Sequence, residues 1–314
     1  MQRIFIVGCP RSGTTLVQAM LGRHPDVFTL PETAFFQELV GDLKWRWGDR
    51  DARAKKRRPH HRLGFARNSG RHALRQLQRE LLDRDAHLGH IPWRTHGCTR
   101  RFVGMLDDLA GRASCSAWLE KTPNHLLYIP EIESAVPDAY FVHVLRRGLD
   151  VIASLTDATL RFGAYQAFDG SVALWTHRWN HAMGIHASHV GRPRHHFVFL
   201  EELERDSAAV WQKLCGFLDL PADAVLGSSC GHAVADLGKE PWKHAAVDGM
   251  PCQVERKVDE LFGPRIKQWL QSYLTPYDAW RTLYAPPSAT IPFPVPYPRS
   301  SRETMPAEAV TRTG

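Results

Sequence analysis

No hydrophobic run in this sequence approaches the roughly 18 residues that a membrane-spanning helix needs, so we expect none. An apolar stretch followed by a small-residue cleavage site is also missing near the start, so we expect no signal peptide. The six cysteines are scattered without a Cys-x-x-Cys pair, which is typical of free thiols in a reducing compartment such as the cytoplasm. Hydrophobic residues make up 43% of the chain and charged residues 23%, which excludes a disordered, collagen-like or coiled-coil protein.

Positive charge is concentrated in one part of the chain, whose overall net charge is +7. Between Lys44 and Arg101 there are 17 Lys and Arg residues against 5 Asp and Glu, a net of +12, whereas the rest has a net of −5. This basic block favours a polyanionic ligand or partner, with a solvated helical surface as the alternative. A polyanion-binding protein is therefore one candidate function, but the block lacks a nucleic-acid-binding motif and we expect no nucleic-acid partner.

Short apolar segments alternate with helical patterns along most of the chain. Strands are expected in "RIFIVG", in "VFTLPE" and at the starts of "SAWLEKTPNH", "YFVHVLRRG" and "HHFVFLEEL". Helices are expected over Thr14–Arg23, over much of 34–113 and over Ala164–His189, and a single helix is expected between "HHFVF" and Pro221. This alternation predicts an α/β fold with a central parallel sheet flanked by helices. We expect a single domain over 1–284, with 34–113 as a basic helical excursion on the acceptor side, and a Pro-rich tail over 285–314.

The segment "GCPRSGTT", Gly8 to Thr15, carries the strongest chemical signal, because it lies between an expected strand and an expected helix. It matches the phosphate-binding loop G-x-x-x-x-G-K-[ST] at Gly8, Gly13 and Thr15, but Thr14 stands in the lysine position. Backbone N–H groups and the helix N-terminus would together form a cradle for a phosphate or sulfate. Kinases place the missing lysine on the nucleotide phosphates and use Mg²⁺. We therefore expect no metal, and a small-molecule P-loop kinase is the enzyme alternative.

The run "PRSGTTLVQAMLGRHPDV", followed by "PET", resembles the opening of sulfotransferases that use 3′-phosphoadenosine 5′-phosphosulfate (PAPS), most closely the tyrosylprotein sulfotransferases and their bacterial relatives. The later run "FVHVLRRGLDVIASL" is similar to the family's second motif. The resemblance implies a P-loop NTPase-like three-layer fold and the use of PAPS. It assigns the 5′-phosphosulfate to Arg11, Ser12, Gly13, Thr14 and Thr15, and the 3′-phosphate to Arg146 and Ser154. Leu200 departs from the family, which usually has tyrosine there.

The same resemblance implies the catalytic residues. Glu32, in "LPETAFF", would be the general base that removes the proton of an acceptor hydroxyl. Lys121 and Arg11 would offset the charge that develops on the departing oxygens. From the residues alone, Glu32 could equally stabilise the start of the following helix, and Lys121 could be a surface lysine.

The remaining predictions concern the acceptor and the late part of the chain. The acceptor hydroxyl could belong to a protein tyrosine, a glycan or a small molecule, and the basic block favours an acidic acceptor. Lys239 and Lys243 are candidates to close over the cofactor, with a surface loop as the alternative. His177 and His181 have the i, i+4 spacing of a metal pair, but no glutamate of the H-E-x-x-H kind accompanies them.

Overall fold

The computed structural model describes residues 1–49, 52, 63–82, 90–162, 169–224, 226–227, 230–231, 234–235, 246–247 and 257–282. Met1–Tyr277 forms one compact unit, and Asp278–Thr282 is the described part of a second unit. Three features singled out in the sequence lie outside the described residues: the basic run 55–58, the pair Lys239 and Lys243, and the Pro-rich segment 285–314.

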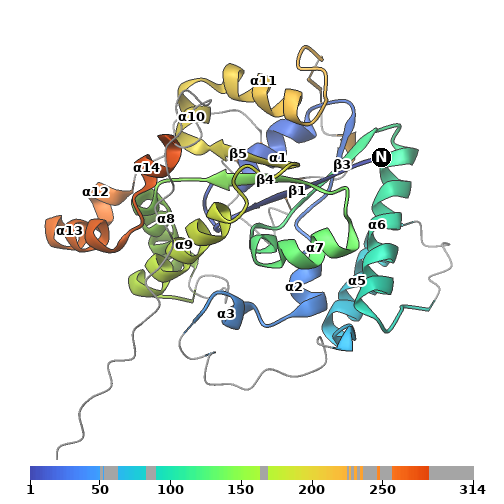
Figure 1. Ribbon diagram of the computed structural model, residues 1–314, viewed down its shortest axis with the longest axis horizontal. Helices are drawn as coiled ribbons and strands as arrows, with labels where there is room; N and C mark the ends of the chain where they lie inside the picture. Colours follow the sequence, from blue (N-terminus) through green and yellow to red (C-terminus); the bar gives the residue numbers. More distant parts are fainter. Residues whose placement is uncertain are drawn as a thin grey trace, which may run out of the picture. The chain divides into compact units, whose positions relative to one another are not determined.

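A parallel sheet forms the centre of the first unit, in the order β5-β4-β1-β3-β2-β6 (Figure 1). Its strands are β1 (Gln2–Gly8), β2 (Val27–Thr29), β3 (Ala117–Lys121), β4 (Tyr140–Leu145), β5 (His195–Phe199) and the two-residue β6 (Cys230–Gly231). The pairings between these strands are all parallel, and helices lie on both sides of the sheet (Figure 1). The predicted three-layer α/β architecture is confirmed.

Helices fill most of the connections between the strands. They are α1 (Thr14–Gly22), α2 (Phe35–Val40), α3 (Leu43–Arg46), α5 (Asn68–Leu81), α6 (Thr95–Arg112), the 3₁₀ helix η2 (Pro123–Tyr128), α7 (Ile129–Ala135), α8 (Gly148–Phe162), α9 (Val172–Ala187), α10 (Leu200–Arg205), α11 (Ser207–Phe217), α12 (Val258–Leu261), α13 (Pro264–Tyr273) and α14 (Tyr277–Thr282). Within the described ranges, no helix is long and apolar enough to cross a bilayer.

Two helix predictions were wrong in their boundaries. The helix expected over Ala164–His189 begins only at Val172, because the Ser171 side chain caps it by accepting a hydrogen bond from the backbone N–H of Leu174. The single helix expected after β5 is two helices, α10 and α11. They meet at Asp206, whose carboxylate accepts from the backbone N–H of Ala209 and caps the second helix.

The alternation of side chains along each strand gives the sheet two different faces. One face is aliphatic: Ile4, Ile6 and Leu119 belong to the core cluster that includes residues of α1, α10 and α11. The other face is aromatic and centres on Phe5, whose ring lies 5.4 Å from that of Trp118, 6.1 Å from that of Phe36 and 5.8 Å from that of Phe141. Each layer of helices therefore packs on a chemically distinct surface.

The register of the parallel strands brings their carboxyl ends to one edge of the sheet. Gly8 at the end of β1 pairs with Val144 of β4, and Ile6 pairs with Lys121 at the end of β3. The turns that follow β1, β2, β3 and β4 therefore meet at this edge, which is where open α/β sheets bind ligands.

A chain of buried histidines links β4, β5 and α9. His143 Nδ1 lies 2.9 Å from His186 Nδ1, His143 Nε2 lies 2.9 Å from His195 Nδ1, and His195 Nε2 lies 3.1 Å from Glu133 Oε1. Neutral rings satisfy all three contacts when His195 donates to Glu133, His143 donates to His195 and His186 donates to His143. Burial lowers the pKa of His143 well below its ordinary value and that of His186 to about 3.

We expect the free energy of unfolding to fall as the pH is lowered from 7 to 4. The unfolded histidines take up protons near their ordinary pKa of about 6.5, whereas the buried ones stay neutral to lower pH. The unfolded state therefore binds more protons in this window. His186→Phe removes one buried titrating group and should flatten the pH dependence measured by urea denaturation at pH 7, 6, 5 and 4.

His72, which is exposed on α5, provides the control. His72→Gln should leave the slope as in the wild type. The slope should diminish in His186→Phe without disappearing, because burial still lowers the pKa of His143, His189 and His195 in that variant. Equal slopes for the wild type and His186→Phe would contradict this prediction.

Candidate active site

The turn between β1 and α1 adopts a backbone conformation that is rare for residues other than glycine. Arg11 has a φ of 70° and Gly13 a φ of 96°, both in the left-handed region. A Cβ on Gly13 would lie 2.8 Å from Leu200 Cδ1, so a side chain here would displace the leucine as well as strain the backbone. Ser12 and Thr14 are buried, and the backbone N–H of Ser12 donates to the Cys9 carbonyl at 3.1 Å. The segment is a tight turn that leads directly into the N-terminus of α1.

Arg11, Ser154 and Arg146 meet beside this turn. Arg11 Nε donates to Ser154 Oγ at 3.0 Å, and Arg146 Nη1 donates to the Arg11 carbonyl at 3.3 Å. Burial lowers the pKa of Arg11, and the nearby charge of Arg146 lowers it further. Burial also lowers the pKa of Arg146, an effect that Asp150 and Glu201 oppose. Two partly desolvated guanidinium groups of like charge therefore lie together, an arrangement that a bound anion would stabilise.

Neighbouring side chains hold the turn after β4 in place. The indole N–H of Trp179 donates to the Arg146 carbonyl at 3.2 Å, and the backbone N–H of Arg147 donates to Glu201 Oε1 at 2.8 Å. Arg147 Nε lies 3.2 Å from Asp150 Oδ2 and 3.5 Å from Glu201 Oε1, so this guanidinium is directed to carboxylates. Arg146, and not Arg147, is the arginine that reaches the β1–α1 turn.

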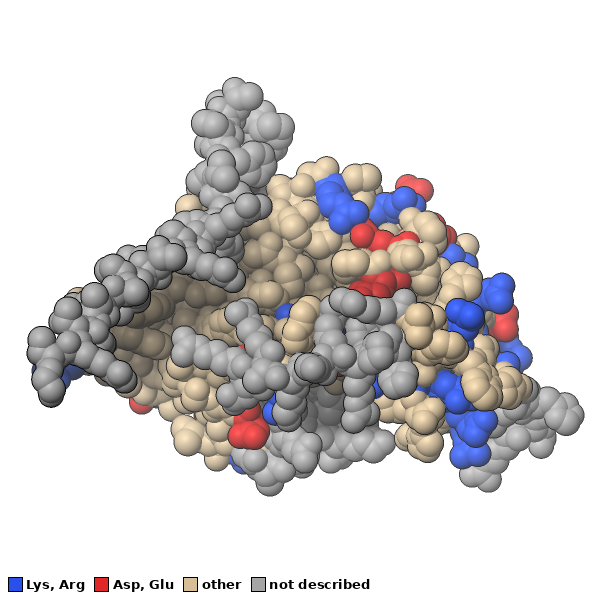
Figure 2. Space-filling model, turned by 60° about the horizontal axis from the view of Figure 1, so that its bottom comes forward, with Lys and Arg blue, Asp and Glu red and all other residues tan. Residues whose placement is uncertain are grey.

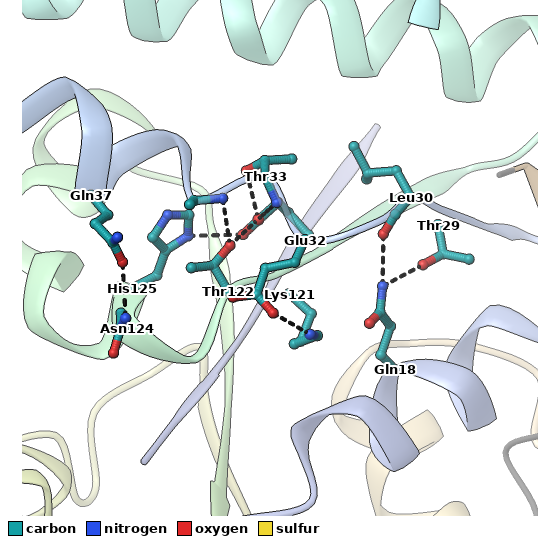
Figure 3. A network of polar contacts seen from close by, with 12 residues as sticks. Gln18, Thr29, Leu30, Glu32, Thr33, Gln37, Lys121, Thr122, Asn124 and His125 are labelled. Carbon is teal, nitrogen blue, oxygen red and sulfur yellow. Dashed lines mark hydrogen bonds and ion pairs between the residues drawn. The ribbon is translucent and has the colours of Figure 1, made fainter. Parts of the chain in front are cut away.

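Glu32 and Lys121 form an ion pair at the ends of β2 and β3, with Lys121 Nζ 2.7 Å from Glu32 Oε2 (Figure 3). The Lys121 side chain is fully buried, so the surface-lysine alternative is wrong. The Glu32 side chain keeps 25% of its surface exposed, which leaves it accessible to a reactant. An ammonium at this distance favours the ionised carboxylate, the form that can accept a proton.

Sequence reasoning missed a second carboxylate next to this pair. Glu120 precedes Lys121 in β3 and is completely buried, and its oxygens accept hydrogen bonds from Thr33, Thr122 and His125. The available signal was a charged residue inside an otherwise apolar strand, "AWLEK". Burial opposes the charge of Glu120, but the contacts with His125, Thr122 and Thr33 outweigh it and hold the pKa of this carboxyl below its ordinary value.

The histidine pair on α9 has a structural role. His177 Nε2 lies 3.0 Å from the Trp47 carbonyl and 3.1 Å from the Gly48 carbonyl, so it donates to backbone oxygens. Over the described part of the chain, no group of three or more His, Cys, Asp or Glu residues could hold a metal ion.

The site thus has two parts with different chemistry. The turns after β1 and β4 gather Arg11, Arg146 and Ser154 next to a helix N-terminus and suit an anion. The turns after β2 and β3 gather Glu32 and Lys121 and suit a proton transfer next to a developing negative charge. Thr15, the last residue of the β1–α1 segment, is half-buried in the first turn of α1.

Comparison with curated proteins finds distant relatives. A protein-tyrosine sulfotransferase from Drosophila melanogaster is 26% identical over 269 residues, which cover 84% of this chain and 45% of that protein. A related sequence from Caenorhabditis briggsae is 29% identical over 168 residues, covering 54% of this chain and 48% of that protein. The chain therefore spans about half the length of the curated relatives it matches.

Solved structures give weaker likenesses. A sulfotransferase from Alicyclobacillus acidocaldarius is 17% identical with a TM-score of 0.46, covering 87% of this chain and 92% of that one. A mouse sulfotransferase solved in complex with PAP (3′-phosphoadenosine 5′-phosphate) is 13% identical with a TM-score of 0.48, covering 90% and 89%.

The match that decides the family covers most of the chain. The model of the sulfotransferase family matches residues 3–224, which include the β1–α1 turn, Glu32, Lys121, Arg146 and Ser154. The chain belongs to the sulfotransferase family.

Proposed function

We propose that this protein transfers a sulfuryl group from PAPS to an acceptor hydroxyl. The observation that carries the proposal is the contact of Arg11 with Ser154 and of Arg146 with the Arg11 carbonyl beside the β1–α1 turn. A nucleotide with phosphates at both its 5′ and 3′ positions needs two anion sites. The β1–α1 turn would supply one, and Arg146 and Ser154 after β4 would supply the other. Membership of the sulfotransferase family supports the same reading.

The residues present fit such a donor. The left-handed turn at Arg11 and Gly13 directs the chain into the N-terminus of α1, where N–H groups suit a 5′-phosphosulfate. Ser154 accepts from Arg11, which leaves its hydroxyl proton to donate to a 3′-phosphate beside Arg146. An anion between the two guanidinium groups would relieve their mutual repulsion.

The proposed mechanism uses Glu32 as base and two cations as charge stabilisers. PAPS supplies the sulfuryl group. Glu32 accepts the proton of the acceptor hydroxyl, which makes that oxygen a better nucleophile. Lys121 and Arg11 stabilise the negative charge that grows on the departing phosphate oxygen, and the N-terminus of α1 adds to their effect. The ion pair between Glu32 and Lys121 places the base and one of these cations together before the acceptor arrives.

An acidic acceptor is the class that the charge distribution favours. Basic side chains gather on the side of the molecule where α5 and α6 lie (Figure 2). The described part of the basic block includes Arg67, Arg71, Arg75, Arg79, Arg94, Arg100 and Arg101. A positive field of this kind lowers the KM of an anionic acceptor more than that of a neutral one. We therefore propose a tyrosine flanked by acidic residues, or an acidic glycan, as the acceptor.

Ser154→Ala and Arg146→Ala should each weaken the binding of PAP. Each variant removes a hydrogen-bonding group from the 3′-phosphate, at a cost of about 1–3 kcal/mol. Adenosine 5′-phosphosulfate lacks that phosphate, so its affinity should change little. Isothermal titration with both nucleotides measures the difference.

Thr156→Ala is the matched control, because Thr156 lies on the same helix and its hydroxyl donates to the Ile152 carbonyl. It should leave the affinity for both nucleotides unchanged. An equal loss of affinity for both nucleotides in the Ser154 and Arg146 variants would show that these residues do not hold the 3′-phosphate.

Glu32→Gln should lower kcat by about 10²–10⁴-fold, the usual contribution of a general base, with the affinity for PAP nearly unchanged. The assay follows transfer from labelled PAPS to a tyrosine peptide flanked by glutamates and to the same peptide flanked by glutamines. The basic block predicts a lower KM for the glutamate peptide. Glu38→Gln on α2 is the control. Near wild-type turnover in Glu32→Gln would remove the base assignment.

A further inference from the structure

Glu120 contacts both the segment after β2, which carries the proposed base Glu32, and the segment after β3, which follows Lys121. It is the residue before Lys121 in β3, and successive residues of a strand point to opposite faces. Phe5, which faces the aromatic layer, pairs with Glu120 in the sheet, whereas Ile6, which faces the α1 layer, pairs with Lys121. The Glu120 carboxylate therefore does not share a face with Lys121, and it is completely buried. It is not placed to act on a substrate itself.

The Glu120 carboxylate joins the chain after β2 to the chain after β3. Its Oε1 accepts from Thr33 Oγ1 at 2.7 Å and from Thr122 Oγ1 at 2.6 Å, and its Oε2 lies 2.8 Å from His125 Nδ1. Thr33 follows Glu32 and Thr122 follows Lys121. One side chain thus fixes the immediate neighbours of both members of the ion pair.

The same network holds four consecutive backbone N–H groups. Thr33 N donates to Glu120 Oε1 at 3.4 Å, and Ala34 N donates to Thr122 Oγ1 at 3.0 Å. Phe35 N donates to Thr33 Oγ1 at 3.2 Å, and Phe36 N donates to His125 Nε2 at 3.1 Å. Ala34 has a φ of 50°, a left-handed conformation that its surroundings must enforce. The turn that presents Glu32 is therefore built on Glu120 and its three partners.

The hydrogen bonds also fix the protons of the network. His125 Nε2 accepts from a backbone N–H, so the ring proton is on Nδ1 and donates to Glu120. Each threonine hydroxyl donates to Glu120 and accepts from the backbone. An ionised Glu120 satisfies every one of these donors, whereas an amide in its place would turn an N–H group toward one of them.

We propose that Glu120 is a positioning residue for sulfuryl transfer, which sets the placement of Glu32 relative to Lys121 through Thr33, Thr122 and His125. This inference rests on the proposed function. A base displaced by about 1 Å loses up to about 10²-fold in rate. Glu120→Gln should therefore lower kcat by about 10- to 10²-fold. The Kd for PAP should change less than about twofold, because Arg11, Arg146 and Ser154 lie outside the network.

Thr122 gives a milder test that keeps the buried carboxylate. Thr122→Val removes the hydroxyl that links Glu120 to the Ala34 N–H, whereas Thr122→Ser retains it. The valine variant should lose about 10-fold in kcat, and the serine variant should regain most of that loss. Thr99→Val is the matched control, because Thr99 is also buried and its hydroxyl donates to the Thr95 carbonyl in α6. It should keep the kcat of the wild type.

A double-mutant cycle separates positioning from a general structural role. If Glu120 and Thr122 act through Glu32, then Thr122→Val added to Glu32→Gln should change kcat by less than about twofold. The assay is transfer from labelled PAPS to the glutamate-flanked tyrosine peptide, with the Kd for PAP as the measure of a folded site. Multiplied losses in the double variant, or wild-type kcat in Thr122→Val, would overturn the proposal. If the wild type transfers no sulfuryl group, the proposed function fails instead. If Glu32→Gln keeps full kcat, the assignment of Glu32 as the base fails, and the positioning role of Glu120 fails with it.

Discussion

Two like charges brought together at the end of a parallel sheet are the feature on which this structure's site depends. Arg11 follows the carboxyl end of β1 and Arg146 follows that of β4. Because these strands pair side by side, the two arginines lie close together. Burial makes each guanidinium costly; the charge of Arg146 adds to the cost at Arg11, whereas Asp150 and Glu201 offset part of the cost at Arg146. Hydrogen bonds from the indole of Trp179 and to the carboxylate of Glu201 hold the backbone of the turn that carries Arg146. A site of this kind is organised before its anion arrives, so binding does not have to gather the charges.

The order of the strands places the anion cradle and the Glu32–Lys121 pair on opposite sides of β1. With β1 in the middle, β4 on one side contributes Arg146 to the anion cradle. On the other side, β3 and β2 contribute Lys121 and Glu32. The donor and the acceptor hydroxyl would therefore approach from neighbouring strands, with the β1–α1 turn between them. Hydrogen bonds stabilise both halves, through Glu201 next to the anion cradle and through Glu120 next to the segment that carries the proposed base.

The sequence was sufficient for the architecture, and it singled out most of the residues that gather at the candidate site, because both depend on local signals. The apolar runs that end in "GCPRSGTT" and in "VLRRG" predicted the strands and the turns after them, and the structure brings Arg11, Arg146 and Ser154 together beside the first of these turns. The contact between Glu32 and Lys121 follows from the order β3-β2, which spacing alone does not reveal. Glu120 escaped notice because its partners come from two separate turns. The start of α9 was misplaced because helical periodicity outweighed the capping signal of Ser171.

A crystal structure with bound PAP tests the central claim most directly, namely that the cluster of Arg11, Arg146 and Ser154 recognises a nucleotide phosphorylated at both ends. We expect the 5′-phosphate on the backbone N–H groups of residues 11–15 and the 3′-phosphate within hydrogen-bonding distance of Arg146 and Ser154. Glu32 and Lys121 should lie on the side from which an acceptor reaches the 5′ end. A nucleotide bound elsewhere, or bound here with its 3′-phosphate in solvent, would show that this cluster does not recognise the 3′-phosphate.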